Sequence, residues 1–299
     1  YHGGVLTGNA DTLVVDGGTY PFFSDPAGST TNLTVSVNED GANSAAAQFG
    51  AAASHLAQLL LGQAGTATLM APAIHPLLVA DHFEVAETGG SPLGTLNLVI
   101  GGLLVDYDDA GPSPYGTIAD YIAASRQAGG GAPWTGNGVT SSLAIDSPQH
   151  YAVGLAEATD VFGGGAGTFL GETLPAGDRA LLVRATVLGD GNLDGEVTAA
   201  DYTLWADHFG SDGSGWAGGD FNGDGSTTAA DYTLWADHFG WSMDAVPTGV
   251  GGTDEAGETV VLVSSLAAPA STDTSPSTDR PERSRGTLPP TMPVAGLLN

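Results

Sequence analysis

Short apolar runs separated by glycine-rich turns fill the first third of the chain. Within these runs Leu, Val and Ala alternate with Thr, Ser and Asn, which is the two-residue period of a β-strand. Short strands at short, regular intervals predict an all-β architecture. The low aromatic content and the Gly- and Ala-rich turns favour a β-solenoid of stacked rungs over a sandwich. The expected strands are 12–15, 32–37, 66–70, 77–85, 95–100 and 103–107, within a β-rich domain at 1–110.

One stretch of this domain departs from the alternating pattern. Residues 45–61 are rich in Ala, Gln and Leu, which favour helices. A helix is therefore the alternative to strands at this place.

A mixed α/β segment at 111–187 is expected to close the β domain. Residues 115–127 have helical composition, with Ile118, Tyr121 and Ile122 on one face, and the glycines at 129–131 stop the helix. A loop at 134–142 leads to a short helix, and 151–158 and 180–187 are expected strands.

The region 190–240 contains an internal duplication. Residues 198–210 and 228–240 are identical over thirteen positions, which indicates a repeat. Each copy ends in an expected helix, at 202–210 and 232–240, with Tyr, Trp and Phe at positions i, i+3 and i+7. This spacing places the three aromatic residues on one stripe. We expect the two stripes to pack on each other as a small core, with an exposed aromatic docking face as the alternative.

A twelve-residue acidic loop precedes each of these helices. Calcium loops of the EF-hand type take oxygen ligands from positions 1, 3, 5, 7, 9 and 12, with Gly at position 6. Both loops fill every position, and Gly195 and Gly225 take the sharp turn. The sequence therefore predicts two calcium ions. The ligand positions are Asp190, Asn192, Asp194, Glu196 (carbonyl), Thr198 and Asp201 in the first loop, and Asp220, Asn222, Asp224, Ser226 (carbonyl), Thr228 and Asp231 in the second. The alternative is a pair of Asp/Gly turns that cap two helices.

The two units differ from ordinary EF-hands in a consistent way. Position 12 is Asp instead of Glu, and no helix enters either loop, because 181–187 predicts a strand and 211–219 a linker. Tandem loop–helix units of this kind resemble a type I dockerin, the calcium-dependent docking module of secreted polysaccharide-degrading systems. The resemblance implies a small α-helical module at 188–241 and a cohesin-type partner.

In dockerins the partner is contacted mainly by residues near loop positions 10 and 11 and further along the helix. The best-known dockerins carry hydroxyl side chains at positions 10 and 11, whereas this chain carries Ala. Calcium binding therefore carries over by resemblance, but the identity of the partner does not. The corresponding positions are Ala199, Ala200 and Asp207 in the first copy and Ala229, Ala230 and Asp237 in the second.

Four further pieces carry a second resemblance. Residues 104–107, 134–138, 153–158 and 182–190 are similar to a segment that precedes dockerin repeats in large secreted planctomycete-type proteins with β-solenoids. This resemblance implies an extracellular, repeat-built protein with no assigned catalysis.

Charge narrows the classes of partner. The 299 residues include six Arg, no Lys and 34 acidic residues, for a net charge of −28. This charge argues against nucleic acids and anionic membrane surfaces. Ten of the acids and no Arg lie in 190–240, as a divalent cation site requires.

Location is inferred from calcium and from missing signals. Extracellular modules bind calcium at about 10⁻⁴–10⁻³ M, which matches the medium outside the cell. The chain has no Cys and no apolar run long enough for a membrane span. It begins at Tyr1 without a signal sequence, so we expect a processed chain or a fragment. Residues 242–299 are rich in Ser, Thr, Pro and Asp and are expected to be a mostly disordered tail, with one strand at 260–263 as an option.

Catalysis is the alternative function. Dockerins usually tether glycoside hydrolases, which need two carboxylates about 5–10 Å apart across a cleft. The acids at 84, 87, 106, 108 and 109 are candidates, but their pattern is that of polar turns. His55, His75 and His82 lack metal-ligand spacing. We therefore favour a non-catalytic extracellular protein that anchors or assembles through its dockerin, with the C-terminal part of a glycoside hydrolase as the alternative and polysaccharide as one candidate ligand. A calcium-stabilised module without any cohesin is the third interpretation.

Overall fold

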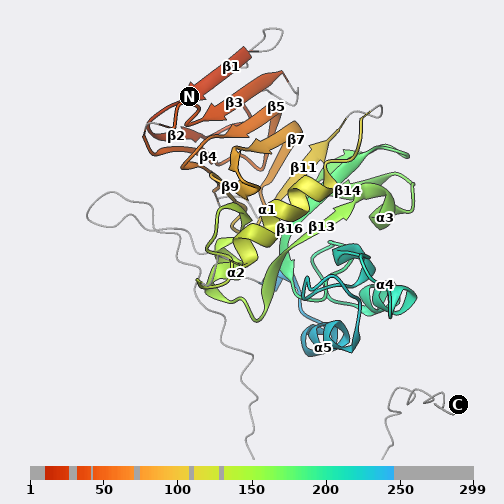
Figure 1. Ribbon diagram of the computed structural model, residues 1–299. Coiled ribbons are helices and arrows are strands. Elements are labelled where there is room, and N and C mark those ends of the chain that lie inside the picture. The colour runs from red at the N-terminus through yellow and green to blue at the C-terminus, as the bar shows by residue number, and fades with distance from the viewer. Residues whose placement is uncertain are drawn as a thin grey trace, which may run out of the picture. The chain divides into compact units, whose positions relative to one another are not determined.

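Two parallel sheets stack along the first half of the chain in the computed structural model (Figure 1). The structure describes residues 11–26, 32–41, 43–70, 75–107, 111–127 and 131–245. Successive strands alternate between the sheets, which makes a β-solenoid of about four turns and confirms the expected architecture. In spatial order, the first sheet contains β1 (Asp11–Val15), β3 (Leu33–Val37), β5 (Ala53–Leu61), β7 (Leu77–Val85), β11 (Gly102–Asp106), β16 (Ala180–Val187) and β13 (Tyr151–Glu157), and the second contains β12 (Gly138–Thr140), β10 (Thr95–Asn97), β6 (Gly65–Leu69), β4 (Ala45–Phe49) and β2 (Gly18–Phe22).

Apolar side chains of successive turns line up because the parallel strands pair in register. Val15 pairs with Val37, Val37 with Leu61, and Leu61 with Val85. All four are buried. In the second sheet the Phe22 and Phe49 rings stack with centroids 4.9 Å apart. Ladders of apolar residues at the inward-facing strand positions thus fill the solenoid interior.

The helix considered for residues 45–61 is wrong, since the segment forms β4 and β5. Both strands lie inside their sheets, with a neighbour on each side. Tertiary pairing therefore overrides the helix propensity of Ala, Gln and Leu. The expected strand at 95–100 is also shorter, as β10 ends at Asn97.

A mixed layer closes the C-terminal end of the solenoid. Helix α1 (Tyr115–Gln127) packs on β12, and the Tyr121 hydroxyl bonds to the main chain of Val85. Strands β16 and β13 continue the first sheet: β16 runs antiparallel to β11, and β13 runs antiparallel to β16, so β13 has the direction of the solenoid strands again. The smaller elements of this region are β8 (Glu87–Thr88), β9 (Ser91–Pro92), α2 (Ser142–Asp146), α3 (Ala158–Phe162), β14 (Gly167–Phe169) and β15 (Glu172–Leu174).

The duplicated region forms two helices, α4 (Ala199–His208) and α5 (Ala229–His238) (Figure 1). Each helix begins three residues before the expected start. Two short 3₁₀ turns accompany them, η2 (Trp216–Gly218) and η3 (Met243–Ala245). The described helices include none that is both long and apolar enough to cross a membrane. The expected strand at 260–263 lies outside the described residues.

Candidate calcium loops and docking helices

The first position of each loop is tied to the glycine turn at the sixth. Asp190 Oδ2 accepts a hydrogen bond from the Gly195 amide at 3.0 Å, and Asp220 Oδ2 accepts one from Gly225 at 2.9 Å. Both glycines have φ of +93°, a conformation that a Cβ would strain. The two loops therefore share one backbone turn around their first carboxylate.

The hydrogen bonds at the third and fifth positions are also the same in the two loops. Asn192 Oδ1 accepts from the Asp194 amide at 3.0 Å, and Asp194 Oδ1 accepts from the Glu196 amide at 2.8 Å. The equivalent bonds of the second loop are 2.7 Å and 3.0 Å long. These Asx-type bonds set the course of each loop from position 3 to position 7.

The last positions join each loop to its helix. Thr198 caps α4, and its side chain accepts from the Ala200 amide at 3.2 Å. Asp201 bonds back to the Thr198 amide at 2.8 Å, which completes a capping box. Asp201 also accepts from the Gly191 and Asn192 amides at the start of the loop. Because the cap is at position 9, positions 10–12 are the first helical turn, and the helix begins earlier than predicted. Thr228 and Asp231 repeat the cap in α5.

The donor set fits a hard divalent cation. Carboxylate, amide, hydroxyl and carbonyl oxygens are the ligands that calcium prefers. Asp190 is fully buried, and within the described residues its Oδ1 has no hydrogen-bond partner. Burial raises the pKa of Asp190 to about 7, against the opposing effects of the Thr186 hydroxyl and Arg184, so a bound cation would further favour its charged form.

The carboxylates are not arranged as a finished metal site. Across the described part of the chain, three His, Asp or Glu side chains nowhere converge in a metal-binding group. The loop carboxylates accept bonds from loop amides instead, and Asp194 and Asp224 are exposed. The assignment of individual ligands stays a prediction.

A reciprocal clasp joins the two repeats. Trp205 donates its indole N–H to the Thr228 carbonyl, and Trp235 donates to the Thr198 carbonyl, both at 2.8 Å. Each loop also forms backbone hydrogen bonds with the other repeat. Thr227 of the second loop pairs with the backbone just after α4, and Val197 of the first loop pairs with the backbone just after α5. Each loop–helix unit therefore satisfies backbone hydrogen bonds of the other.

The aromatic stripes contact each other, as expected, but only in part. The Tyr202 and Trp235 rings lie 5.2 Å apart, and so do those of Trp205 and Tyr232. The outer side chains stay open to solvent: Tyr202, Tyr232, Phe209 and Phe239 are 37%, 40%, 53% and 56% exposed. The stripes thus form a core on one side and an exposed aromatic face on the other.

The predicted partner-contact residues share this open surface. All six, Ala199, Ala200, Asp207, Ala229, Ala230 and Asp237, are exposed. Their position is compatible with docking, and their role stays a prediction.

Comparison with protein families decides the nature of this region. Residues 188–238 match the dockerin type I domain. This segment is a dockerin. No match was found among curated proteins or among solved structures. Dockerin domains bind calcium and dock on cohesins, so the match indicates calcium-dependent docking for this part of the chain.

The other candidate residues lie outside the dockerin loops in the sequence. Glu84 on β7 contacts His82 at 3.2 Å, and Glu87 is exposed on β8. Asp106 is exposed at the end of β11, whereas positions 108 and 109 lie outside the described residues. His55 contacts Asp25 and Glu172, and His75 contacts Asp244. His55 and His75 thus each join segments that are far apart in the sequence.

Sequence reasoning missed two arginines that touch the dockerin loops. Arg184 on β16 donates to the Leu193 carbonyl at 2.7 Å, and Arg126 on α1 donates to the Phe221 carbonyl at 2.9 Å. Burial lowers the pKa of both guanidinium groups, and neighbouring loop carboxylates oppose this effect. The one available signal is the scarcity of cations, since the chain has only six and no Lys.

Proposed function

We propose that this chain is a non-catalytic extracellular protein in which a dockerin binds two calcium ions and docks on a cohesin-type partner. The observation that supports this most directly is the pair of equivalent loop–helix units within the matched dockerin segment. The β-solenoid would be the passenger or scaffold that the docking anchors.

Each calcium ion would be held by the ligand positions of one loop. In the first loop these are the Asp190, Asn192, Asp194, Thr198 and Asp201 side chains with the Glu196 carbonyl, and in the second their counterparts thirty residues later. Calcium would supply positive charge that offsets the repulsion among the three carboxylates of a loop. The unpartnered Oδ1 of Asp190 supports this assignment for the first loop.

The proposed partner surface is the exposed face of α4 and α5. Because the two helices have the same sequence and matched exposure, a cohesin could bind in either of two orientations related by the duplication. Ala at loop positions 10 and 11 makes the contact less polar than in the best-known dockerins.

The test of calcium binding uses two double variants with equal loss of charge. Calorimetry on the full chain should show two bound ions. Asp194→Ala with Asp224→Ala removes one predicted ligand from each loop and should abolish most of the binding heat. Asp207→Ala with Asp237→Ala removes the same charge from exposed helix positions and should leave two ions bound. Equal losses in both variants would show that the loops are not the ligand sites.

The test of docking follows from the first. Binding of the full chain to a panel of immobilised cohesin domains should require calcium and vanish in excess chelator. Calcium binding without any cohesin binding would favour the third interpretation, a calcium-stabilised module with no such partner.

A further inference from the structure

One buried and one partly buried arginine of the β domain each bond to a backbone carbonyl of a different dockerin loop. We propose that Arg126 and Arg184 dock the dockerin on the β domain of its own chain, so that calcium binding also orders α1 and β13. This inference rests on the calcium binding proposed above. It makes the dockerin an integral layer of the protein instead of a module on a flexible tether.

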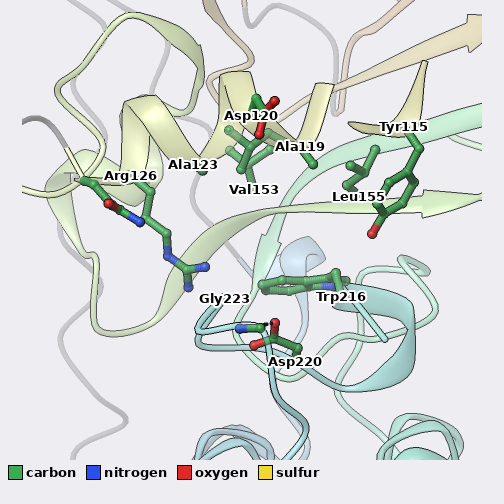
Figure 2. A pocket seen from close by; sticks show the side chains of 14 residues that line it. Tyr115, Ala119, Asp120, Ala123, Arg126, Val153, Leu155, Trp216, Asp220 and Gly223 are labelled. Atoms are coloured by element: carbon green, nitrogen blue, oxygen red, sulfur yellow. Dashed lines mark hydrogen bonds between the residues drawn. The ribbon is translucent and has the colours of Figure 1, made fainter. Parts of the chain in front are cut away.

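Arg126 reaches the second loop from helix α1. Its guanidinium donates to the carbonyl of Phe221, at loop position 2, and stacks over the Trp134 ring at 5.3 Å. Figure 2 shows the side chain extending from α1 toward Gly223. A Cβ at Gly223 would lie 2.0 Å from the guanidinium, so the loop backbone fits directly against it. The loop carboxylates at positions 1, 5 and 12 favour its positive charge.

Arg184 holds the first loop from strand β16. It is 5% exposed and donates to the carbonyl of Leu193, at loop position 4. A Cβ at Gly195 would lie 2.3 Å from its Nη2, so the turn glycine packs on the guanidinium. Asp190 and Asp194 favour its charged form. Each loop is therefore contacted by one arginine guanidinium from outside the duplicated sequence.

Close packing around Trp216 and Gly215 also joins the dockerin to the β domain. Trp216 lies between the two loops in sequence and is buried against β13, where a Cβ at Gly154 would come within 2.8 Å of its ring. Its indole N–H donates to the Asp190 carbonyl at 2.6 Å. The Tyr115 hydroxyl of α1 lies so close to Gly215 that a Cβ there would be 2.3 Å away. A cavity of about 250 Å³ remains between α1, β13 and the second loop (Figure 2).

No linker separates the first loop from the β domain. Strand β16 ends at Val187, and the first ligand position is Asp190. Thr186, still in the strand, donates its hydroxyl to Asp190 Oδ2. The strand that bears Arg184 therefore also positions the first predicted calcium ligand.

These contacts couple the two parts thermodynamically. A ligand that binds only the ordered loop stabilises every segment that orders together with that loop. The arginines also offset carboxylate repulsion in the loops when calcium is absent. Calcium should thus slow local opening of α1 and β13, although neither element supplies a ligand.

The experiment is hydrogen exchange of the full chain with and without calcium, next to a calcium titration of the same sample. We expect calcium to slow exchange in peptides from α1 and β13, on the order of 10-fold, as well as in the loops. Arg126→Gln should lose the response in α1 while still binding two ions. Arg179→Gln is the matched control, because Arg179 stacks on Tyr107 and bonds to Gly111, away from the loops.

The outcomes separate this inference from the proposed function. If calcium binds but changes exchange only in 188–245, the inference is overturned and calcium binding stands. If no calcium binds, both fail. If Arg126→Gln retains the response of α1, the role of that arginine is refuted. The wild-type comparison decides the coupling even if the variant does not fold.

Discussion

Replacement of Asp201 by Ala tests how the first loop is held. The carboxylate is fully buried and accepts four hydrogen bonds, at 2.9 Å from Gly191, 3.2 Å from Asn192, and 2.8 Å and 3.2 Å from the amide and hydroxyl of Thr198. Bonds to a charged group contribute about 1.5–3 kcal/mol each, but they are not additive. Burial opposes the charged form and raises the pKa of Asp201, which offsets part of the contribution of these bonds. We therefore expect the variant to lose about 3–5 kcal/mol of unfolding free energy.

Asp207→Ala is the matched control, because Asp207 lies on the same helix and is exposed. Its effect should stay within about 0.5 kcal/mol. Urea unfolding followed by tryptophan fluorescence in excess chelator measures both variants, since Trp205 and Trp235 pack at the repeat interface. The chelator separates the loss of hydrogen bonds from the loss of calcium. A loss below about 1 kcal/mol for Asp201→Ala, or equal losses for both, would refute the loop network.

Three further outcomes are expected. Trp235→Phe should cost about 1 kcal/mol in urea unfolding, because the indole bond to the other repeat is lost; no loss would contradict the clasp. Phe22→Ala should cost about 3–5 kcal/mol, since it opens a cavity beside Phe49; a cost below 1 kcal/mol would mean a loosely packed solenoid. The hydrogen bond to Asp25 raises the pKa of His55. The wild-type protein should therefore be more stable than His55→Gln by the full amount below about pH 6.5, and this difference in unfolding free energy should shrink as the pH rises further. A difference that grows with pH would contradict the role of this hydrogen bond.

The loops were predictable because their chemistry is local. The predicted ligand positions and the turn glycine all fall within twelve residues, so their spacing indicates the loop, although each helix begins three residues earlier than predicted. The strands were predictable where apolar and polar residues alternate. Strand β2 was missed because Pro21 and Gly18 are turn residues; as the edge strand of its sheet, β2 tolerates a proline.

The long-range contacts were not predictable in the same way. Residues 45–61 match a helix in composition, and only their pairing with neighbouring turns selects strands. Arg126 contacts a carbonyl 95 positions away. No local sequence pattern predicts such a contact, because it depends on how the mixed α/β segment packs on the end of the solenoid.

The helices α4 and α5 have the same sequence but different surroundings. On one side of the dockerin their side chains are equally exposed, whereas on the other side the β domain contacts them unequally. His208 and His238 both bond to the carbonyl four residues before them, at 2.8 Å and 2.7 Å. Only His238 is buried, with its other ring nitrogen 3.0 Å from His150 of the β domain. On the exposed side the helices stay matched, since Tyr202 and Tyr232 differ by only three percentage points in exposure, at 37% and 40%. A partner that contacts only the matched side meets two equivalent faces. Because the β domain is fixed to the unequal side, two binding orientations would place the solenoid differently relative to that partner.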